Sequence, residues 1–164
     1  MNIQKTLELA LQYHNNGHLS EAEGCYRKVL EDQPDQPDAL HYLGVIAHQS
    51  GNNGKAVKLI TKALAIKPDY TEAHNNLGLV LQQLGKLDAA AASFEEALAH
   101  KPDSYEALTN LGNAQEELGL LDAAYVSYQK ALAINPDDPE LLSNLGILLR
   151  SLGRPDQTAT CYRK

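Results

Sequence analysis

Apolar and small residues recur along this chain at the spacing of paired amphipathic helices, and residues 71–104 illustrate the pattern. Positions i, i+3, i+4 and i+7 of the first half are occupied by His74, Leu77, Gly78 and Leu81. This spacing predicts a helix with one buried stripe. The second half carries a comparable stripe of Leu87, Ala90, Ala91, Phe94, Ala97 and Leu98. The segment is therefore predicted to be a hairpin of two short helices.

Residues with restricted backbone preferences mark the ends of these helices. Gly85 stands where a left-handed residue closes the first helix. Asp88 is the expected N-cap of the second helix, which Pro102 stops because proline cannot continue the hydrogen-bond ladder. Asp69 and Asp103 are expected to cap the first helices that follow them.

The same hairpin repeats along the whole chain with a period of 34 residues. The period links the prolines Pro34, Pro68, Pro102 and Pro136. It links the glycines Gly17, Gly51, Gly85, Gly119 and Gly153. It also links the pairs Leu43-Gly44, Leu77-Gly78, Leu111-Gly112 and Leu145-Gly146. No insertion interrupts these series, so one structural unit is predicted to recur from residue 3 to residue 164.

Small and bulky positions alternate in register with this period. Glycine in mid-helix costs roughly 1 kcal/mol relative to alanine, so its recurrence predicts a close approach of the partner helix backbone at Gly78, Gly112 and Gly146. The matching small positions of the second helix are Ala22, Ala56, Ala90 and Ala124. Bulky residues expected to fill the space between neighbours are Tyr26, Ile60, Phe94, Tyr128 and Tyr162. One hairpin cannot bury both faces, so the units must stack.

This pattern resembles the tetratricopeptide repeat (TPR), whose Leu-Gly pair, inter-helix Gly, Ala, aromatic and closing Pro fall at these offsets. The resemblance implies an all-α fold, a right-handed superhelical solenoid of antiparallel helix pairs. We expect a single domain over residues 1–164, with repeats at 3–36, 37–70, 71–104 and 105–138 and a partial fifth at 139–164.

The resemblance also implies that one stripe of each first helix lines a concave groove. The expected groove residues are Asn76, Asn110, Asn144, Tyr42, His41, Asn75, Asn113, Glu72, Glu106 and Gln82. Its sixth-position row contains Asn76, Asn110 and Asn144 at the repeat period. A carboxamide both donates and accepts, so such a ladder can pair with a peptide backbone; alternatively, these side chains bond adjacent helices. Similar ladders occur in repeats of the O-linked N-acetylglucosamine transferase type.

Two further rows allow two interpretations each. The second-position row is Gln4, Asp38, Glu72, Glu106 and Glu140. Its acidic members favour the helix dipole, and they would also bias the groove toward basic ligands. The ninth-position row is Leu11, Val45, Leu79, Asn113 and Ile147. It is either packing or the apolar floor of the groove. The Lys and Arg residues of the repeats that clamp acidic chaperone tails are missing, so that subclass is not expected.

Charge and composition exclude several other functions. The formal net charge is −7 and the pI about 5.3, which argues against nucleic acid and anionic membranes as partners. No stretch approaches the roughly 20 apolar residues of a membrane span. Cys25 and Cys161 should lie at opposite ends of the stack and stay free, as in the cytoplasm. No metal or cofactor is expected, because the six histidines lack further ligands at suitable spacing.

Catalytic motifs are absent from the sequence: there is no phosphate-binding loop, no serine elbow and no Cys-His couple. We therefore expect a non-enzymatic scaffold that binds an extended protein segment. One alternative is the substrate-recruiting arm of a larger transferase, since the last repeat stops at Lys164 as an excised piece would. The other is a self-assembling scaffold, in which chains meet at the open C-terminal end or at the apolar first helix, which carries Ile3, Leu7, Leu9, Leu11 and Tyr13.

Overall fold

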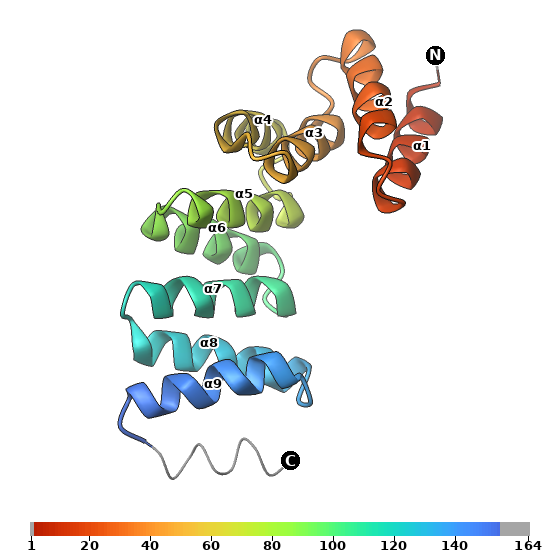
Figure 1. Cartoon of the computed structure of the whole chain (residues 1–164). Coiled ribbons are helices and arrows are strands. Elements are labelled where there is room, and N and C mark those ends of the chain that lie inside the picture. The colour runs from red at the N-terminus through yellow and green to blue at the C-terminus, as the bar shows by residue number, and fades with distance from the viewer. Residues whose placement is uncertain (1, 155–164) are drawn as a thin grey trace. The chain divides into compact units, whose positions relative to one another are not determined.

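The computed structural model describes residues 2–154, and within them the chain forms α-helices and no strand. The helices are α1 (Ile3–Asn15), α2 (Leu19–Asp32), α3 (Pro37–Gln49), α4 (Asn53–Ile66), α5 (Thr71–Gln83), α6 (Leu87–His100), α7 (Tyr105–Glu117), α8 (Leu121–Ile134) and α9 (Pro139–Ser151). The two helices of a repeat lie side by side and run in opposite directions, as α7 and α8 show (Figure 1). The all-α hairpin repeat predicted from the sequence is confirmed.

The chain divides into two compact units, Met1–Val80 and Leu81–Lys164. In the first unit, one core cluster forms around Tyr26 and a second around Ile60. In the second unit, the core forms around Tyr128 and the buried leucines of α9. These bulky side chains and Phe94 are buried, as predicted. Tyr162 lies outside the described residues.

The ends of the first helices agree with the prediction. Gly85 has a φ of +71°, and Gly17, Gly51, Gly119 and Gly153 share this left-handed conformation. Next to it, the Lys86 amide donates to the Leu81 carbonyl, a bond that satisfies an otherwise unpaired end of the helix. At the other boundary, α6 ends at His100, before Pro102.

The predicted aspartate caps are wrong. Lys86 is the N-cap of α6, and its carbonyl already accepts from the Ala90 amide. Asp88 is therefore inside the first turn, where its charge favours the helix dipole. Ser104, not Asp103, caps α7 and accepts from the Ala107 amide. Asp69 is likewise one residue too early, since α5 begins at Thr71.

The mid-helix glycines make room chiefly for a bulky side chain of the second helix, and at Gly44 for the helix backbone as well, which corrects the prediction of backbone approach in part. A Cβ placed on Gly112 would lie 2.4 Å from Cε1 of the Tyr128 ring. A Cβ on Gly44 would lie 2.5 Å from Cγ1 of Ile60 and 3.3 Å from the carbonyl oxygen of Ala56. The bulky residue of the second helix thus packs directly over the glycine of the first.

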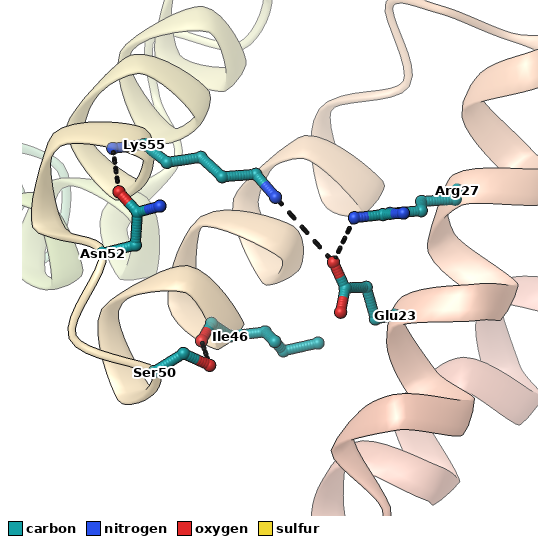
Figure 2. Close-up of polar contacts among 6 residues, drawn as sticks. All are labelled: Glu23, Arg27, Ile46, Ser50, Asn52 and Lys55. Atoms are coloured by element: carbon teal, nitrogen blue, oxygen red, sulfur yellow. Dashed lines mark hydrogen bonds and ion pairs between the residues drawn. The ribbon is translucent and has the colours of Figure 1, made fainter.

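Polar contacts on the surface of the first unit join its two repeats. Glu23 on α2 accepts from Arg27 at 2.6 Å, and the Lys55 ammonium on α4 lies 3.8 Å from the same carboxylate (Figure 2). The Asn52 side chain caps α4 by accepting from the Lys55 amide. Such exposed pairs contribute about 0–1 kcal/mol each, so the apolar core dominates the stability.

Candidate partner-binding surfaces

Four aromatic rings pack together in the unit Met1–Val80. Tyr26 of α2 stacks on Tyr42 of α3, with ring centroids 5.5 Å apart and planes 10° apart. The ring of His41 lies 4.8 Å from that of Tyr42 and 4.7 Å from that of Tyr70, which immediately precedes α5. Stacked and edge-on contacts of this kind favour one arrangement of the rings over others. The four rings therefore form one packed aromatic cluster within this unit.

Two hydrogen bonds link His41 of this cluster to Tyr70 and Asn76. The side-chain amide nitrogen of Asn76 can only donate, so His41 Nε2 accepts from it at 2.8 Å. His41 Nδ1 then carries the proton and donates to the Tyr70 hydroxyl at 3.0 Å. The Asn76 amide thus sets the direction of both bonds and the tautomer of His41.

His41 has a structural position rather than one on the groove surface. Its side chain is 1% exposed, so the direct ligand contact expected from the sequence does not fit the structure. Burial lowers the pKa of His41 to about 4 and keeps the ring neutral near pH 7. His74, by contrast, is only half-buried, and its Nε2 donates to the Pro68 carbonyl at 2.7 Å.

A hollow of about 200 Å³ opens beside the aromatic cluster, and we term it the aromatic hollow. It is lined by Gln4, Leu7, Glu8, Leu11, Tyr26, Asp38, Tyr42 and Tyr70. Leu11 is 37% exposed and lines the hollow, which fits the alternative of an apolar groove floor. The hydroxyl of Tyr26 is buried and has no hydrogen-bond partner. The hollow thus combines aromatic faces, two carboxylates and one unpaired hydroxyl.

A second hollow, of about 400 Å³, lies in the unit Leu81–Lys164, and we term it the amide hollow. It is lined by Gln82, Asn113, Glu116, Glu117, Tyr128 and Asn144. The Tyr128 hydroxyl is shared between Asn113 Oδ1 at 2.7 Å and Glu116 Oε2 at 2.9 Å. The Gln82 amide donates to Glu117 in a short hydrogen bond. Three carboxamides and two carboxylates therefore face one open space.

The predicted asparagine row has three different environments. Asn76 donates to buried His41. This contact agrees with the alternative interpretation, in which the asparagine side chains bond adjacent helices. Asn110 and Asn75 are half-buried and hold polar contacts of their own. Asn144 lines the amide hollow, and its side chain makes no hydrogen bond within residues 2–154. Only Asn144 of the row therefore combines access to a hollow with free bonding capacity.

The other expected groove residues divide between the surface and the hollows. Glu72 and Glu106 are exposed in the first turns of α5 and α7, where they favour the helix dipole. Asn113 and Gln82 line the amide hollow, and Tyr42 lines the aromatic hollow. In the ninth-position row, Val45 and Leu79 are half-buried and Ile147 is 45% exposed, so the members of this row do not share one environment.

Sequence reasoning missed Tyr26, Tyr70 and Tyr128, because each was interpreted as core or not considered. One signal was available for Tyr70. It stands at the repeat position where the other repeats carry the polar N-caps Gln36, Ser104 and Asp138. An aromatic side chain at a capping position indicates a local function different from capping.

Residues 2–154 contain neither a cluster of metal-ligating side chains nor a helix suited to cross a membrane. No three His, Cys, Asp or Glu side chains come together as the ligands of a metal ion would. None of the described helices has the length and apolar character required to cross a bilayer.

Comparisons with known proteins agree with this architecture. Tetratricopeptide-repeat family models match residues 35–103, 75–139 and 127–158. No curated protein matches the sequence.

Among solved structures, "Crystal structure of MamA" is 22% identical with a TM-score of 0.85, covering 94% of this chain and 90% of that one. MamA residues 41 to the end from Desulfovibrio magneticus RS-1 is 20% identical with a TM-score of 0.86, covering 98% and 90%. PilF of Pseudomonas aeruginosa is 24% identical with a TM-score of 0.85, covering 98% of this chain and 74% of PilF. With the 34-residue hairpins, the glycine and proline boundaries and the buried bulky positions, these matches lead to one conclusion: the chain belongs to the tetratricopeptide-repeat family.

Proposed function

We propose that this chain is a non-enzymatic protein-interaction scaffold, and that an extended segment of a partner protein binds along the first helices of its repeats. Repeats of this family stack into surfaces that contact other proteins. Most residues that line the two hollows belong to first helices; the exceptions are Tyr26, Tyr70 and Tyr128. Free Cys25 fits a scaffold that works in the reducing cytoplasm.

The observation that carries the proposal is the amide hollow. Asn144, Asn113 and Gln82 offer carboxamides, the side chains that match both the N–H and the C=O of a peptide. Asn144 has no bond within the described residues, so it can pair with a ligand without breaking an internal contact. An extended backbone presents donors and acceptors regardless of its sequence, and the side-chain amide is complementary to both.

The charge of the hollow favours a basic segment. Glu116 and Glu117 lie at the C-terminal end of α7, where the helix dipole is already negative. Both carboxylates accept hydrogen bonds only from neutral groups, Tyr128 and Gln82. A ligand with lysine or arginine would therefore gain attraction here that an acidic ligand would not.

The test starts from a ligand selected out of a random-peptide display library with the whole chain as bait. Asn144→Ala should weaken that ligand about threefold to tenfold, the value of one lost hydrogen bond, with unchanged helicity by circular dichroism. The matched control is Asn135→Ala, since Asn135 is exposed and lines neither hollow. Equal affinity of wild type and Asn144→Ala would contradict the proposal.

Asn76 needs a separate interpretation in the same experiment. Asn76→Ala removes the donor of buried His41, so it should lower the free energy of unfolding by about 1–3 kcal/mol. A loss of binding in that variant counts only if its unfolding curve shows a folded protein at the assay temperature.

Two alternatives keep specific support. Asn144 in the amide hollow also fits the substrate-recruiting arm of a glycosyltransferase-like enzyme, and a transferase domain encoded after Lys164 in the natural gene would favour it. Self-assembly is supported by α1, where Leu9 is 42% exposed beside Leu11. Sedimentation showing a dimer that Leu9→Glu dissociates would favour that second alternative.

A further inference from the structure

We propose that the aromatic hollow binds the cationic side chain of a lysine or arginine residue in the partner's segment, a role that rests on the proposed scaffold function. The hollow lies within one compact unit. Its lining joins aromatic rings to carboxylates, the combination that recognises ammonium and guanidinium groups.

The two carboxylates of the hollow have no cationic partner. Glu8 accepts from the Gln4 amide at 3.1 Å, and Asp38 accepts from the Gln36 amide at 3.2 Å. Among the described residues, every ion pair involves other acids. Asp38 is half-buried, so water screens its charge less than that of a carboxylate on an open surface, whereas Glu8 is exposed and adds a second negative charge to the lining.

The rings provide faces for the same cation. Tyr26 and Tyr42 stack, and Tyr70 completes the lining. The chain already uses Tyr70 in this way, because the Lys67 ammonium lies 4.2 Å from the centroid of its ring. A ligand cation desolvated between rings and carboxylates gains more than one exposed pair does.

The unpaired hydroxyl of Tyr26 supplies an acceptor. Tyr26 is 1% exposed, and a buried polar group without a partner is rare. Three repeats further on, Tyr128 stands at the same position and donates to Asn113. In the first repeat the equivalent of Asn113 is Leu11, which cannot accept. The N–H of a bound cation would hydrogen-bond the oxygen that the fold leaves unpaired.

The volume fits one side chain. A water molecule occupies about 30 Å³ in the liquid, so about 200 Å³ holds several heavy atoms. The lysine side chain consists of a four-carbon stem and one nitrogen. Leu7 and Leu11 line the hollow and would contact such a stem, while the carboxylates meet its charged end.

The experiment uses ¹⁵N-resolved NMR titrations of the full chain with the peptide acetyl-Gly-Ser-Lys-Ser-Gly-amide, its arginine counterpart and its norleucine counterpart. We expect the two cationic peptides to shift the amide signals of Glu8, Tyr26 and Tyr42, and the norleucine peptide to bind about tenfold more weakly. Equal binding of the norleucine peptide, shifts elsewhere, or no shifts with either cationic peptide would overturn the proposal.

Two variants sharpen the result. Glu8→Gln removes one charge from the hollow and should weaken the lysine peptide several-fold, whereas Glu31→Gln removes an exposed charge from α2 and should not. Tyr26→Phe removes the unpaired hydroxyl and keeps the ring, so it should weaken the lysine peptide while the fold stays intact. Unchanged affinity in both Glu8→Gln and Tyr26→Phe would contradict the pocket even if the peptide binds.

The failure of this proposal can be told apart from failure of the scaffold proposal. Asn144→Ala lies in the other compact unit and should leave the lysine-peptide shifts unchanged. If the selected display ligand depends on Asn144 but lysine and norleucine peptides bind alike, the scaffold stands and the cation pocket fails. If the lysine peptide binds selectively but the selected ligand ignores Asn144, the pocket stands and the backbone-pairing groove fails.

Discussion

Tyr26 and Tyr128 occupy the same position of two repeats, and their hydroxyls have opposite environments. Both rings are buried under the first helix of their own repeat. The Tyr128 hydroxyl meets Asn113 and Glu116, while the Tyr26 hydroxyl has no partner. Burial raises the pKa of both hydroxyls, so both stay protonated near pH 7.

The difference comes from two substitutions on the facing helix. The first repeat carries Leu11 and His14 where the fourth carries Asn113 and Glu116. His14 Nδ1 is itself buried without a partner, and the His14 ring packs edge-on against Tyr42. One repeat thus completes its polar contacts internally, and the other leaves two buried polar atoms without a partner, one of them on Tyr26 in the lining of the aromatic hollow. A repeat scaffold can differentiate its surfaces in this way without changing its backbone.

The largest expected difference between the units is their response to acid. The folded-state pKa of His41 is about 4, below the ordinary 6.5, so protonation favours the unfolded chain. The contribution of neutral His41 to the free energy of unfolding is fully present above pH 6.5. It decreases as the pH falls toward 4, by up to roughly 3 kcal/mol. Burial lowers the pKa of His14 as well, which acts in the same direction.

Hydrogen exchange resolved by residue measures this effect. Protection of residues 3–80 should fall between pH 6.5 and about 4 after correction for intrinsic exchange, while that of residues 81–154 should change less. The described part of the second unit has no buried histidine. His41→Gln should reduce the pH dependence of the first unit. Equal acid sensitivity of both units would contradict the comparison.

The next effect concerns the packing of the bulky position over glycine. Gly112→Ala should destabilise by about 1–3 kcal/mol, because the new methyl group meets the rigid Tyr128 ring. Gly24→Ala is the matched control, since nothing lies within 4 Å of a Cβ there. It should stabilise by about 0.5–1 kcal/mol through the helix propensity of alanine. Urea unfolding measures the free energy of unfolding of both variants. An unchanged value for Gly112→Ala would show that the Tyr128 ring moves freely.

The smallest expected effect is the change in the free energy of unfolding when the hydroxyl of Tyr128 or of Tyr26 is removed. Tyr128→Phe should cost about 1 kcal/mol, because it removes bonds to two half-buried acceptors. Tyr26→Phe should be neutral or slightly stabilising, because it removes a buried hydroxyl without a partner. Urea unfolding monitored for each unit measures both changes. Equal costs would mean that the Tyr26 hydroxyl has a partner in solution.

Local sequence signals predicted the helices well where one residue imposes its own backbone preference. Gly85 adopts the left-handed conformation that was expected, and α6 ends before Pro102 as proline requires. Asp88 was predicted as the N-cap two residues too late, because any of several polar residues near a helix start can cap it. The glycine at position 112 was correctly interpreted as a close approach, but the sequence does not show that a tyrosine ring makes it.

The candidate site was predictable only in part. Asn144, Asn113 and Gln82 come together in the amide hollow, as a periodic stripe of polar residues suggested. The aromatic hollow was not foreseen, because its members come from α1, α2, α3 and the segment before α5. No single helix stripe contains them.

The sequence by itself determined the repeat, its hairpin, its glycine turns and its proline ends, because each depends on φ preferences and on apolar spacing within 34 residues. Only the tertiary structure decided that His41 is buried and bonded to Asn76, that Tyr128 finds two acceptors and that Tyr26 finds none. These outcomes depend on which side chains of neighbouring helices meet. That pairing is set by packing distances of a few tenths of an ångström, which a periodic pattern does not contain.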